Sequence, residues 1–343
     1  MKKMLNTLYV LSEDAYASLN GETVEILFQD KSSQRIPLHT LENIVIFSYK
    51  GATPALMGKC EEYGIPICFF TPRGKYLAGI GASVKGNVCL RRTQYRYADD
   101  DEKSLSLSRN MILGKIHNSR QVLLRACRDH PMQVDIDRLC ISADKLEEYL
   151  QQAKGVNNKD TLRGIEGLSA SGYFSVFNEL VLRKKNSFEF TGRSKRPPLD
   201  RINAMLSFAY VLLANECASA LLSVGLDPYV GFFHVDRPGR KSLALDLMEE
   251  FRSVYADRFV LTMINNQVIS EDDFEMQENG AVFIKDGARK TFISKWQERK
   301  RNEIIHPFLK EKIPWGLAMY TQALLLARYL RNDIDQYPPF FWR

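Results

Sequence analysis

The stretch Tyr95-Arg96-Tyr97-Ala98-Asp99-Asp100-Asp101-Glu102-Lys103-Ser104 divides the sequence into two parts with different hydrophobic patterns. Before it, short runs of β-branched and aromatic residues are separated by turn residues, which is typical of strands. After it, apolar residues recur at helical spacing. Because residues 99–102 are acidic and without apolar side chains, we place a domain boundary there. The predicted fold class is α+β, with a β-rich N-terminal domain (1–95), a linker (96–104) and a larger all-α C-terminal domain (105–343).

The N-terminal part is predicted to contain strands, a hairpin and one helix. Asn20-Gly21 lies between two apolar runs and favours a tight turn. A helix is predicted from Pro54 to Tyr63, ending at Gly64. The predicted strands are 7–11, 24–28, 43–47 and 65–70, with a turn at 72–74.

The C-terminal part is predicted to be helical throughout. Asp200 is a suitable N-cap and Gly225 a suitable stop for one long helix, and Pro314 suits the first turn of another. The predicted helices are 105–127, 144–153, 161–183, 200–224, 243–257, 293–309 and 314–331.

Length and composition indicate an ordinary globular protein. The 343 residues favour two domains, and 45% hydrophobic with 26% charged residues is a usual balance. The net charge of +6 is compatible with a nucleic-acid partner but does not require one. The six cysteines are scattered, which disfavours a zinc or redox motif. Because we find neither a secretion signal nor an apolar run of about 18 residues, we expect a cytoplasmic protein.

Glu166 lies in the segment Gly164-Ile165-Glu166-Gly167-Leu168-Ser169-Ala170-Ser171-Gly172-Tyr173-Phe174. The surrounding apolar residues predict a helix buried on nearly all sides, where a carboxylate is costly unless a cation or several donors meet it. The three glycines weaken a helix, which suggests the close approach of another backbone or of a ligand. A glutamate capped by an arginine or a tyrosine is the alternative.

His234 ends the segment Leu226-Asp227-Pro228-Tyr229-Val230-Gly231-Phe232-Phe233-His234. A single histidine is more often structural than a ligand. However, the loop that follows it, 235–241, is basic and turn-forming, and such a loop suits a phosphate held close to an imidazole. The basic residues of this loop are Arg237, Arg240 and Lys241.

Asp246 and Glu249 are three residues apart in the segment 242–252, so they lie on one face of a predicted helix. Two like charges on a mostly apolar helix repel each other unless a cation lies between them. In the alternative interpretation, Asp246 is a first-turn charge favoured by the helix dipole. Glu249 would then be a surface residue paired to Arg252 or Arg240.

Together the three segments predict an ion held by Glu166, His234 and a carboxylate of the Asp246/Glu249 pair. Carboxylate oxygens with one imidazole suit Mg²⁺ or Mn²⁺, whereas zinc ordinarily takes more histidine or cysteine. Such an ion polarises a phosphoryl oxygen and orients an in-line displacement. The sequence has no P-loop, dinucleotide, serine-hydrolase or zinc-protease motif. We therefore predict an enzyme that cuts or joins DNA phosphodiester bonds.

The three segments resemble those of one family, the Cas-one integrase/endonucleases of CRISPR adaptation. They match its patterns G-x-E-G-x-[AS]-A-x-x-Y-F, L-D-P-x-x-G-x-x-H and D-L-x-E-x-F-R in the same order. Gly64-Ile65-Pro66 is similar to part of the family's N-terminal β domain. The overall length and the opening residues look closest to the type I-C subgroup.

The resemblance implies Glu166, His234 and Glu249 as metal ligands, with Asp246 a nearby acid of the same catalytic site. It leaves open whether His234 ligates the ion or assists proton transfer. It also implies a homodimer formed through the N-terminal domains, with two such dimers flanking a small Cas-two partner. The assembly would insert a short double-stranded DNA fragment at a CRISPR repeat by 3′-hydroxyl attack.

Basic side chains are predicted to contact DNA phosphates, and the apolar tail 337–343 to dock on its own domain or on a partner chain. The predicted DNA contacts are Arg237, Arg240, Lys241, Arg252, Arg289 and Lys290. Two other functions stay open at this point. One is a structure-selective nuclease acting on branched repair intermediates, and the other is a non-catalytic nucleic-acid-binding scaffold.

Overall fold

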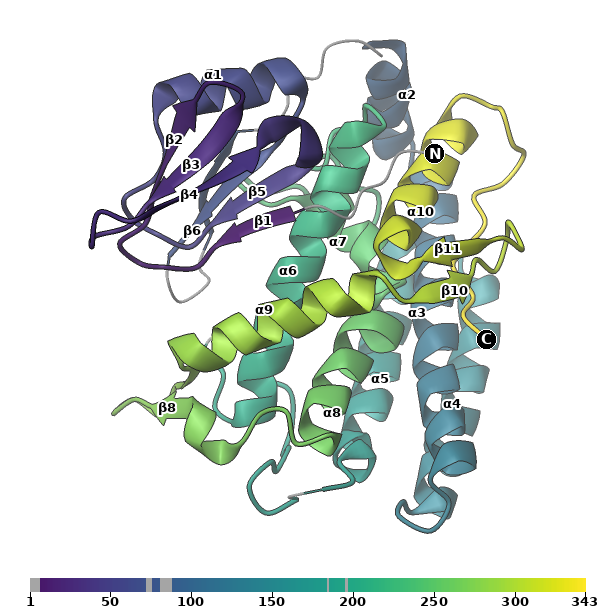
Figure 1. Ribbon diagram of the computed structural model, residues 1–343. Coiled ribbons are helices and arrows are strands. Elements are labelled where there is room, and N and C mark those ends of the chain that lie inside the picture. Colours follow the sequence, from purple (N-terminus) through teal and green to yellow (C-terminus); the bar gives the residue numbers. More distant parts are fainter. Residues whose placement is uncertain (1–6, 72–75, 81–87, 184, 195–196) are drawn as a thin grey trace.

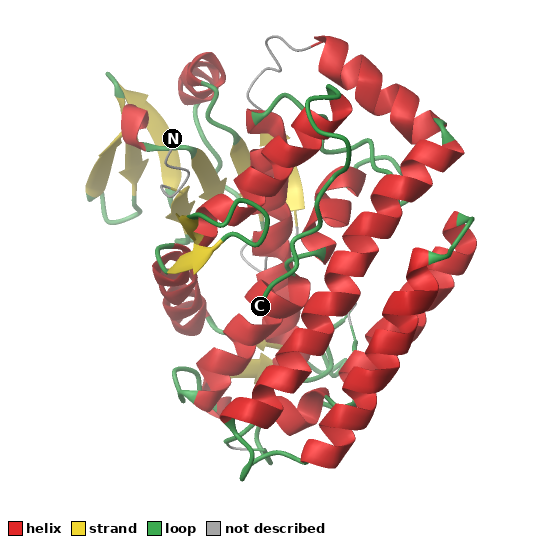
Figure 2. Ribbon diagram, turned by 90° about the vertical axis from the view of Figure 1, so that its right-hand side faces the viewer, coloured by secondary structure: helices red, strands yellow, loops and turns green. Residues whose placement is uncertain are grey.

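The predicted fold class is confirmed, because a strand-rich N-terminal region leads into a larger helical part (Figure 1). The computed structural model describes residues 7–71, 76–80, 88–183, 185–194 and 197–343. The strands gather on one side of the molecule, and long helices form the body beside them (Figure 2). The turn expected at 72–74 lies outside the described residues.

Two small sheets make up the N-terminal region. In the first, strands β1 (Thr7–Val10), β5 (Asn43–Ile46) and β6 (Ile67–Phe70) are parallel, and β7 (Tyr76–Ile80) pairs antiparallel with β6. In the second, β2 (Tyr16–Asn20), β3 (Thr23–Leu27) and β4 (Ser33–Pro37) form an antiparallel meander. The 3₁₀ turn η1 (Leu38–Thr40) leads from the second sheet back to the first.

The turn and cap predictions in this region are confirmed. Gly21 has a φ of +58° in the tight turn between β2 and β3, a conformation that glycine adopts without steric cost. Helix α1 (Pro54–Tyr63) begins after Thr53, whose hydroxyl accepts a hydrogen bond from Leu56 N. It ends at Gly64, which has a φ of +70°.

Strands β5 and β6 are buried on both faces, and this joins the two parts of the chain. Ile44 and Ile46 point into the core between the sheets. Val45, Phe47 and Phe70 pack into the helical core instead, because successive side chains of a strand point to opposite faces. The rings of Phe47 and Phe70 stack with centroids 5.2 Å apart. The sheet therefore has no solvent-facing side along these two strands.

The helical part is described by the following elements. Its α-helices are α2 (Val88–Asp99), α3 (Asp101–Asp129), α4 (Ile136–Lys154), α5 (Lys159–Ser175), α6 (Arg201–Ser223), α7 (Ser242–Glu249), α8 (Arg258–Asn265), α9 (Asp286–Lys300) and α10 (Trp315–Leu330). Two 3₁₀ turns, η2 (Phe177–Leu180) and η4 (Glu271–Asp273), and one π-helical segment, η3 (Arg252–Asp257), connect some of them. Two short hairpins, β8 (Phe274–Met276) with β9 (Val282–Ile284) and β10 (Glu303–Ile305) with β11 (Lys312–Pro314), mean that this part is not entirely α-helical as predicted.

The stretch predicted as a linker, 96–104, is helical. It contains the end of α2 and the start of α3. Asp100 separates the two helices as an N-cap, and its carboxylate accepts hydrogen bonds from the N–H groups of Glu102 and Lys103. Acidic residues in the first turn of a helix interact favourably with its dipole. The polar segment is therefore a helix junction.

The predicted helix 243–257 is interrupted, because α7 ends at Glu249 and the π-helical segment η3 begins at Arg252. The cause lies in a side chain of α3. Asn118 Nδ2 donates a 2.7 Å hydrogen bond to the carbonyl oxygen of Glu250, which is thereby drawn out of the regular helical ladder. Segments of π-helix are frequent at functional sites.

Other predicted helix limits differ from the structure. The helix expected at 161–183 ends at Ser175 and continues as η2, and the one expected at 293–309 runs from Asp286 to Lys300. Pro314 is the N-cap of α10 rather than a first-turn residue. Asp200 caps α6 as predicted, since its carboxylate accepts from Asn203 N at 2.7 Å.

Helix α6 is apolar enough to meet a length-and-composition test for a membrane span, with a mean hydropathy of 1.5, and no other described helix does. However, 67% of that window is buried by the rest of the protein. The helix passes through the middle of the helical body (Figure 1). Its composition therefore follows from its central place in the core.

The C-terminal tail docks on its own helical body, as one of the two predicted alternatives had it. Glu250, which is fully buried, accepts hydrogen bonds from Tyr337 Oη, from Phe340 N at 2.7 Å and from Gln322 Nε2 at 2.8 Å. Asn118 continues this network, because its Nδ2 donates to Phe340 O at 2.7 Å. The tail thus closes over the end of α7.

The buried Glu250 carboxyl predicts a pH-dependent stability. Burial raises its pKa from 4.5 to about 7, even though the hydrogen bonds from Tyr337, Phe340 and Gln322 lower it. A raised pKa in the folded state gives stability that is present below pH 4.5 and is lost as the pH rises through 7. The difference corresponds to about 3 kcal/mol. We expect Glu250→Gln, which cannot ionise, to be more stable than wild type at pH 8 and to lose that advantage at pH 5.

Thermal midpoints measured from pH 5 to pH 8 check this prediction. All other titrating groups are common to both proteins, so the difference between the two curves reports on Glu250. Parallel curves for the variant and the wild type would show that Glu250 does not titrate in this range.

Candidate active site

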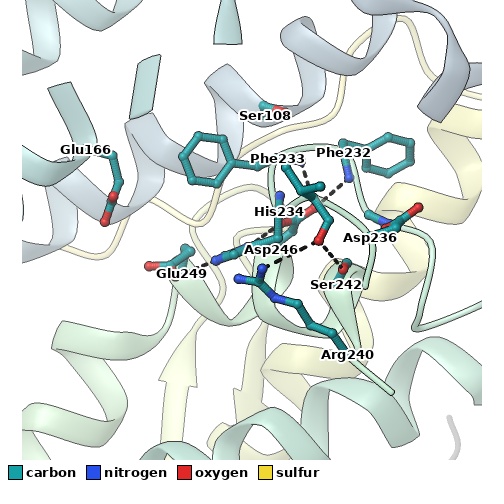
Figure 3. A network of polar contacts seen from close by, with 12 residues as sticks. Ser108, Glu166, Phe232, Phe233, His234, Asp236, Arg240, Ser242, Asp246 and Glu249 are labelled. Carbon is teal, nitrogen blue, oxygen red and sulfur yellow. Dashed lines mark hydrogen bonds and ion pairs between the residues drawn. The ribbon is translucent and has the colours of Figure 1, made fainter. Parts of the chain in front are cut away.

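The four predicted site residues come together from separate parts of the chain (Figure 3). Glu166 lies on α5, His234 on the loop before α7, and Asp246 and Glu249 on α7. His234 Nδ1 is 2.6 Å from Asp246 Oδ1, and His234 Nε2 is 3.9 Å from Glu249 Oε1. Glu166 joins the group through Lys115 of α3, whose ammonium contacts both glutamates.

Asp246 holds the loop that carries the histidine. Its Oδ2 accepts hydrogen bonds from the N–H groups of Phe232 at 2.6 Å and Phe233 at 3.0 Å. Its Oδ1 accepts from His234 N at 2.9 Å and from His234 Nδ1 at 2.6 Å. Because the carboxylate is fully buried and occupied by four donors, Asp246 anchors the loop and is not free to bind an ion.

Gly231 allows the loop to approach α7 this closely. A Cβ atom at this position would lie 2.8 Å from Ser242 Cβ and 2.9 Å from Asp246 Oδ2, which is closer than such atoms are found. Any other residue would therefore push the loop away from the carboxylate that holds it.

Residues close to the predicted domain boundary hold the same loop from its other side. The buried amide of Gln94, on α2, donates to Asp227 O at 2.7 Å and to Val230 O at 2.8 Å, and accepts from Asp227 N at 2.9 Å. Ser104 Oγ, on α3, donates to Phe232 O at 3.0 Å. The stretch expected to be a linker is therefore part of the support of the site.

The Asp246 carboxylate also orients the imidazole of His234. A carboxylate can only accept, so His234 Nδ1 carries a proton, and Nε2 points towards Glu249 Oε1 at 3.9 Å. Histidines that bind metals commonly donate their other ring nitrogen to a carboxylate in this way. The bond to Asp246 therefore makes Nε2 the ring nitrogen that faces the glutamates.

Lys115 lies between the two glutamates. Its Nζ contacts Glu166 Oε1 and is 2.7 Å from Glu249 Oε2. The side chain of Lys115 is only 9% exposed and that of Glu249 only 3%, so this pair is shielded from water. Glu166 is thus paired with a side chain of this chain, as the alternative interpretation had it, but the partner is a lysine and not an arginine or a tyrosine.

Glu249 stays ionised despite its burial. Burial raises its pKa, but the charges of Arg252, Lys115 and His234 outweigh that effect and lower the pKa to about 2. Arg252 Nη1 is 3.3 Å from Glu249 Oε1, and its guanidinium lies over the ring of Tyr210, 4.7 Å from the centroid. The pairing of Glu249 with Arg252 that the alternative interpretation allowed is therefore present, but Glu249 is buried rather than on the surface.

Helix α5 differs from the prediction of burial on nearly all sides. Its buried residues lie along one face, at Leu162, Ile165, Ser169 and Tyr173. The three glycines of its motif face open space within this chain, because a Cβ atom at 164, 167 or 172 would meet nothing within 4 Å. Close approach of another backbone of this chain therefore does not explain them.

A cavity of about 500 Å³ adjoins Glu166. Its lining includes Lys115, Arg193, Arg252 and Asp257. Burial raises the pKa of Asp257 to about 6, although Tyr210 Oη, which donates a 2.6 Å hydrogen bond to Asp257, lowers it. Cationic and polar groups share its wall with apolar side chains such as Phe174 and Phe190, and of the two glutamates Glu166 lines it.

A divalent cation fits the donor set of this site. Glu166 and Glu249 already share one cation, the ammonium of Lys115, and His234 Nε2 lies 3.9 Å from Glu249 Oε1. Within the described ranges, no three histidine, cysteine or acidic side chains form a ready-made metal cluster. Glu166 and Glu249 thus meet at Lys115, and His234 lies beside the other oxygen of Glu249.

The predicted DNA contacts fall into three groups. Arg237 is exposed in the loop after His234, beside Arg240 and Lys241, which are partly buried. Arg252 belongs to the site itself. Arg289, on α9, pairs with Asp286 of the same helix and lies 3.9 Å from Glu13 of the N-terminal region, and Lys290 next to it is exposed. Only the first two groups adjoin the predicted ligands.

Lys115 and Asn118 are site residues that sequence reasoning missed. Both lie on the buried face of α3, among Met111, Ile112 and Ile116. The sequence signal for these two residues is that a charged and an amide side chain lie within an otherwise mostly apolar stripe of α3. A buried lysine at such a position requires an acidic partner, and this rule would have pointed to Glu166 or Glu249.

Known proteins match this chain over most of its length. Residues 8–298 match the family model described as "CRISPR associated protein Cas1". The chain is 48% identical over 343 residues to the CRISPR-associated endonuclease Cas1 1 of Chlorobaculum tepidum, and 46% identical over 347 residues to the CRISPR-associated endonuclease Cas1 2 of Rhodospirillum rubrum. Both alignments cover 100% of each chain.

Solved structures show the same fold. A casposase bound to integration product has a TM-score of 0.84 at 22% identity, covering 98% of this chain and 93% of its own. A Cas1 protein from Thermotoga maritima has a TM-score of 0.82 at 22% identity, covering 95% and 97%. A family model that matches residues 8–298 and relatives that align over the whole chain show that the chain belongs to the Cas1 family of CRISPR-associated proteins.

Proposed function

We propose that this protein is a metal-dependent DNA endonuclease and integrase that inserts short foreign DNA fragments into a CRISPR array. The observation that carries the proposal is the convergence of Glu166 and Glu249 on one cation, beside a histidine whose Nε2 is left free by the bond from Nδ1 to Asp246. The full-length relatives named CRISPR-associated endonuclease support a nuclease. The casposase with an integration product, a protein of the same fold, is consistent with strand transfer.

The residues of the chain would divide the work as follows. Glu166, Glu249 and His234 Nε2 would hold Mg²⁺ or Mn²⁺, which when bound polarises a phosphoryl oxygen and favours in-line attack by a DNA 3′-hydroxyl. Asp246 keeps the imidazole in one tautomer and one orientation. Arg252 keeps Glu249 ionised.

The surroundings of the site suit a DNA substrate. The cavity beside Glu166 has Arg193 and Arg252 in its wall, and phosphate groups favour such cationic linings. The exposed loop that carries Arg237 lies directly after His234 and would contact the DNA backbone. Such contacts position a duplex without reading its sequence, so binding would weaken as salt concentration rises.

We further propose the partners implied by the family. These are double-stranded DNA, a second copy of this chain joined through the N-terminal sheets, and a Cas2 protein. A Cas6-RT-Cas1–Cas2 complex contains a chain of the same fold, with a TM-score of 0.83 and 21% identity, of which this chain covers 37%. A cytoplasmic location and membership of the type I-C subgroup are proposed on the sequence features alone.

Removal of a metal ligand is expected to abolish strand transfer while the fold persists. His234→Ala and Glu249→Gln should each lower Mn²⁺-dependent joining of a branched DNA by at least about 100-fold, as at other sites where a charge-stabilising group is lost. The matched control is Glu216→Gln. Glu216 is also a buried glutamate paired to a lysine, Lys300, at 3.0 Å, but it lies outside the site. Circular dichroism establishes that the variants are folded.

The same assay separates the competing functions. With the partner Cas2 protein, an integrase inserts a fragment into a plasmid that carries the repeat and not into a plasmid without it. A repair nuclease cleaves branched DNA but shows no preference for the repeat. Full activity in Glu249→Gln would instead favour a DNA-binding scaffold and would reject the proposed site.

Loss of the orienting carboxylate is expected to weaken the site without removing a ligand. In Asp246→Asn the side chain can no longer accept four hydrogen bonds, so the imidazole loses its fixed orientation. We expect Mn²⁺ affinity and strand transfer to fall about 10- to 100-fold. Asp135→Asn, which keeps the N-cap of α4, serves as the control. Unchanged Mn²⁺ affinity in Asp246→Asn would show that Asp246 has no role in orienting the ligand.

A further inference from the structure

The ammonium of Lys115 occupies the place where Glu166 and Glu249 converge. It contacts Glu166 Oε1 and is 2.7 Å from Glu249 Oε2. A divalent ion bound to both carboxylates would lie about 2.0–2.6 Å from the same oxygens. The ion and the ammonium compete for this place, because both bind carboxylate oxygens of Glu166 and Glu249 and the two cations repel each other. Binding of one therefore disfavours binding of the other.

We propose that Lys115 is an internal competitor of the metal ion, which neutralises the two glutamates in the metal-free protein and must leave them before the ion binds. This inference rests on the metal site of the proposed function and names a regulation of that site. Helix α3 has no acidic residue within four positions of Lys115, so its own helix gives it no acidic partner. Its burial next to Glu166 and Glu249 shows that its charge is committed to them.

The protein has a place for the displaced side chain. The cavity of about 500 Å³ is lined by Lys115 itself together with Ser119, Ser169 and Glu166. A lysine has a long flexible stem and a compact charge, so it can rotate into this cavity without a change in the backbone. Arg252 remains 3.3 Å from Glu249 and continues to balance that carboxylate.

This exchange has two consequences for the protein. The metal-free fold does not carry two facing carboxylates without a cation, so it stays stable when no metal is present. The affinity for the ion is also lower than the carboxylates alone would give, because each binding event has to break two ion pairs. Once in the cavity, the ammonium lies beside the ion, where a DNA phosphate would meet it and help to keep it displaced.

A Mn²⁺ titration of the full-length chain, followed by the electron paramagnetic resonance signal of free Mn²⁺, tests the proposal without an activity readout. We expect Lys115→Met to bind Mn²⁺ about tenfold more tightly than wild type, which corresponds to about 1.4 kcal/mol. Lys115→Arg, which restores a cation, should return the affinity towards the wild-type value. Lys115→Gln, which keeps a hydrogen-bond donor but no charge, should behave like Lys115→Met and serves if that variant does not fold.

Lys300→Met is the matched control, because Lys300 is also buried and its Nζ pairs with Glu216 Oε1 at 3.0 Å, outside the site. It should bind Mn²⁺ as wild type does. A second readout is thermal stability: Mn²⁺ should raise the Tm of Lys115→Met by more than it raises that of wild type. Adding Glu166→Gln to Lys115→Met should remove the gain, which locates the ion at the two glutamates.

The outcomes separate this inference from the proposed function. If wild type and Lys115→Met bind Mn²⁺ with equal affinity, or if the variant binds it more weakly, Lys115 is not a competitor, although the metal site stands. If no variant binds Mn²⁺ at all, the metal site of the proposed function fails and the inference fails with it.

Discussion

The carboxylate of Asp246 is the interaction on which the rest of the site depends. It collects the N–H groups of three consecutive residues, 232–234, and the Nδ1 proton of His234, while being fully buried. A buried carboxylate is stable only when donors surround it, so the loop and the helix require each other. Gly231 follows from the same constraint, because only a residue without a side chain fits between the loop and α7. One polar group thereby fixes the position of the imidazole relative to Glu249.

The helices around the Asp246 carboxylate and its loop hold the parts of the site at fixed distances from one another. Helix α2 holds the loop through Gln94, and the start of α3 holds it through Ser104. The same α3 carries Lys115 to the glutamates further along its length. The single helix α3 thus connects Ser104, which supports the His234 loop, to Lys115, which pairs with the two glutamates. Strands β5 and β6, buried on both faces, join the N-terminal sheets to this frame, because their alternate side chains belong to the core between the sheets and to the helical core.

Much of the fold could be obtained from the sequence, and so could the choice of Glu166, His234 and Glu249 as residues that lie near one another, for local reasons. Thr53, Gly64 and Asp200 signal their helix ends through bonds within a few residues, and such signals were reliable. Glu166, His234 and Glu249 stand out as polar exceptions within apolar segments. The role of Gln94 could not be obtained, since its partner is 133 residues away and an amide on a helix has no distinctive local pattern. The break after α7 has the same origin, because it results from Asn118 on another helix.

Glu249 and Glu250 show how strongly position on a helix determines chemistry. They are adjacent and both buried, but their pKa values shift in opposite directions. Burial raises the pKa of both carboxyls. Nearby cations lower that of Glu249 to about 2, whereas that of Glu250 rises to about 7. A step of one residue turns the side chain to another face, so Glu249 meets Lys115 and Arg252 while Glu250 meets Tyr337 and the tail. The tail therefore packs against the point at which α7 ends. Glu249 is the last residue of α7 and Arg252 the first of η3, so the interruption of the helix lies between these two charges. Two neighbouring carboxylates thus serve two different parts of the molecule, Glu249 the group around Lys115 and Glu250 the docked C-terminal segment.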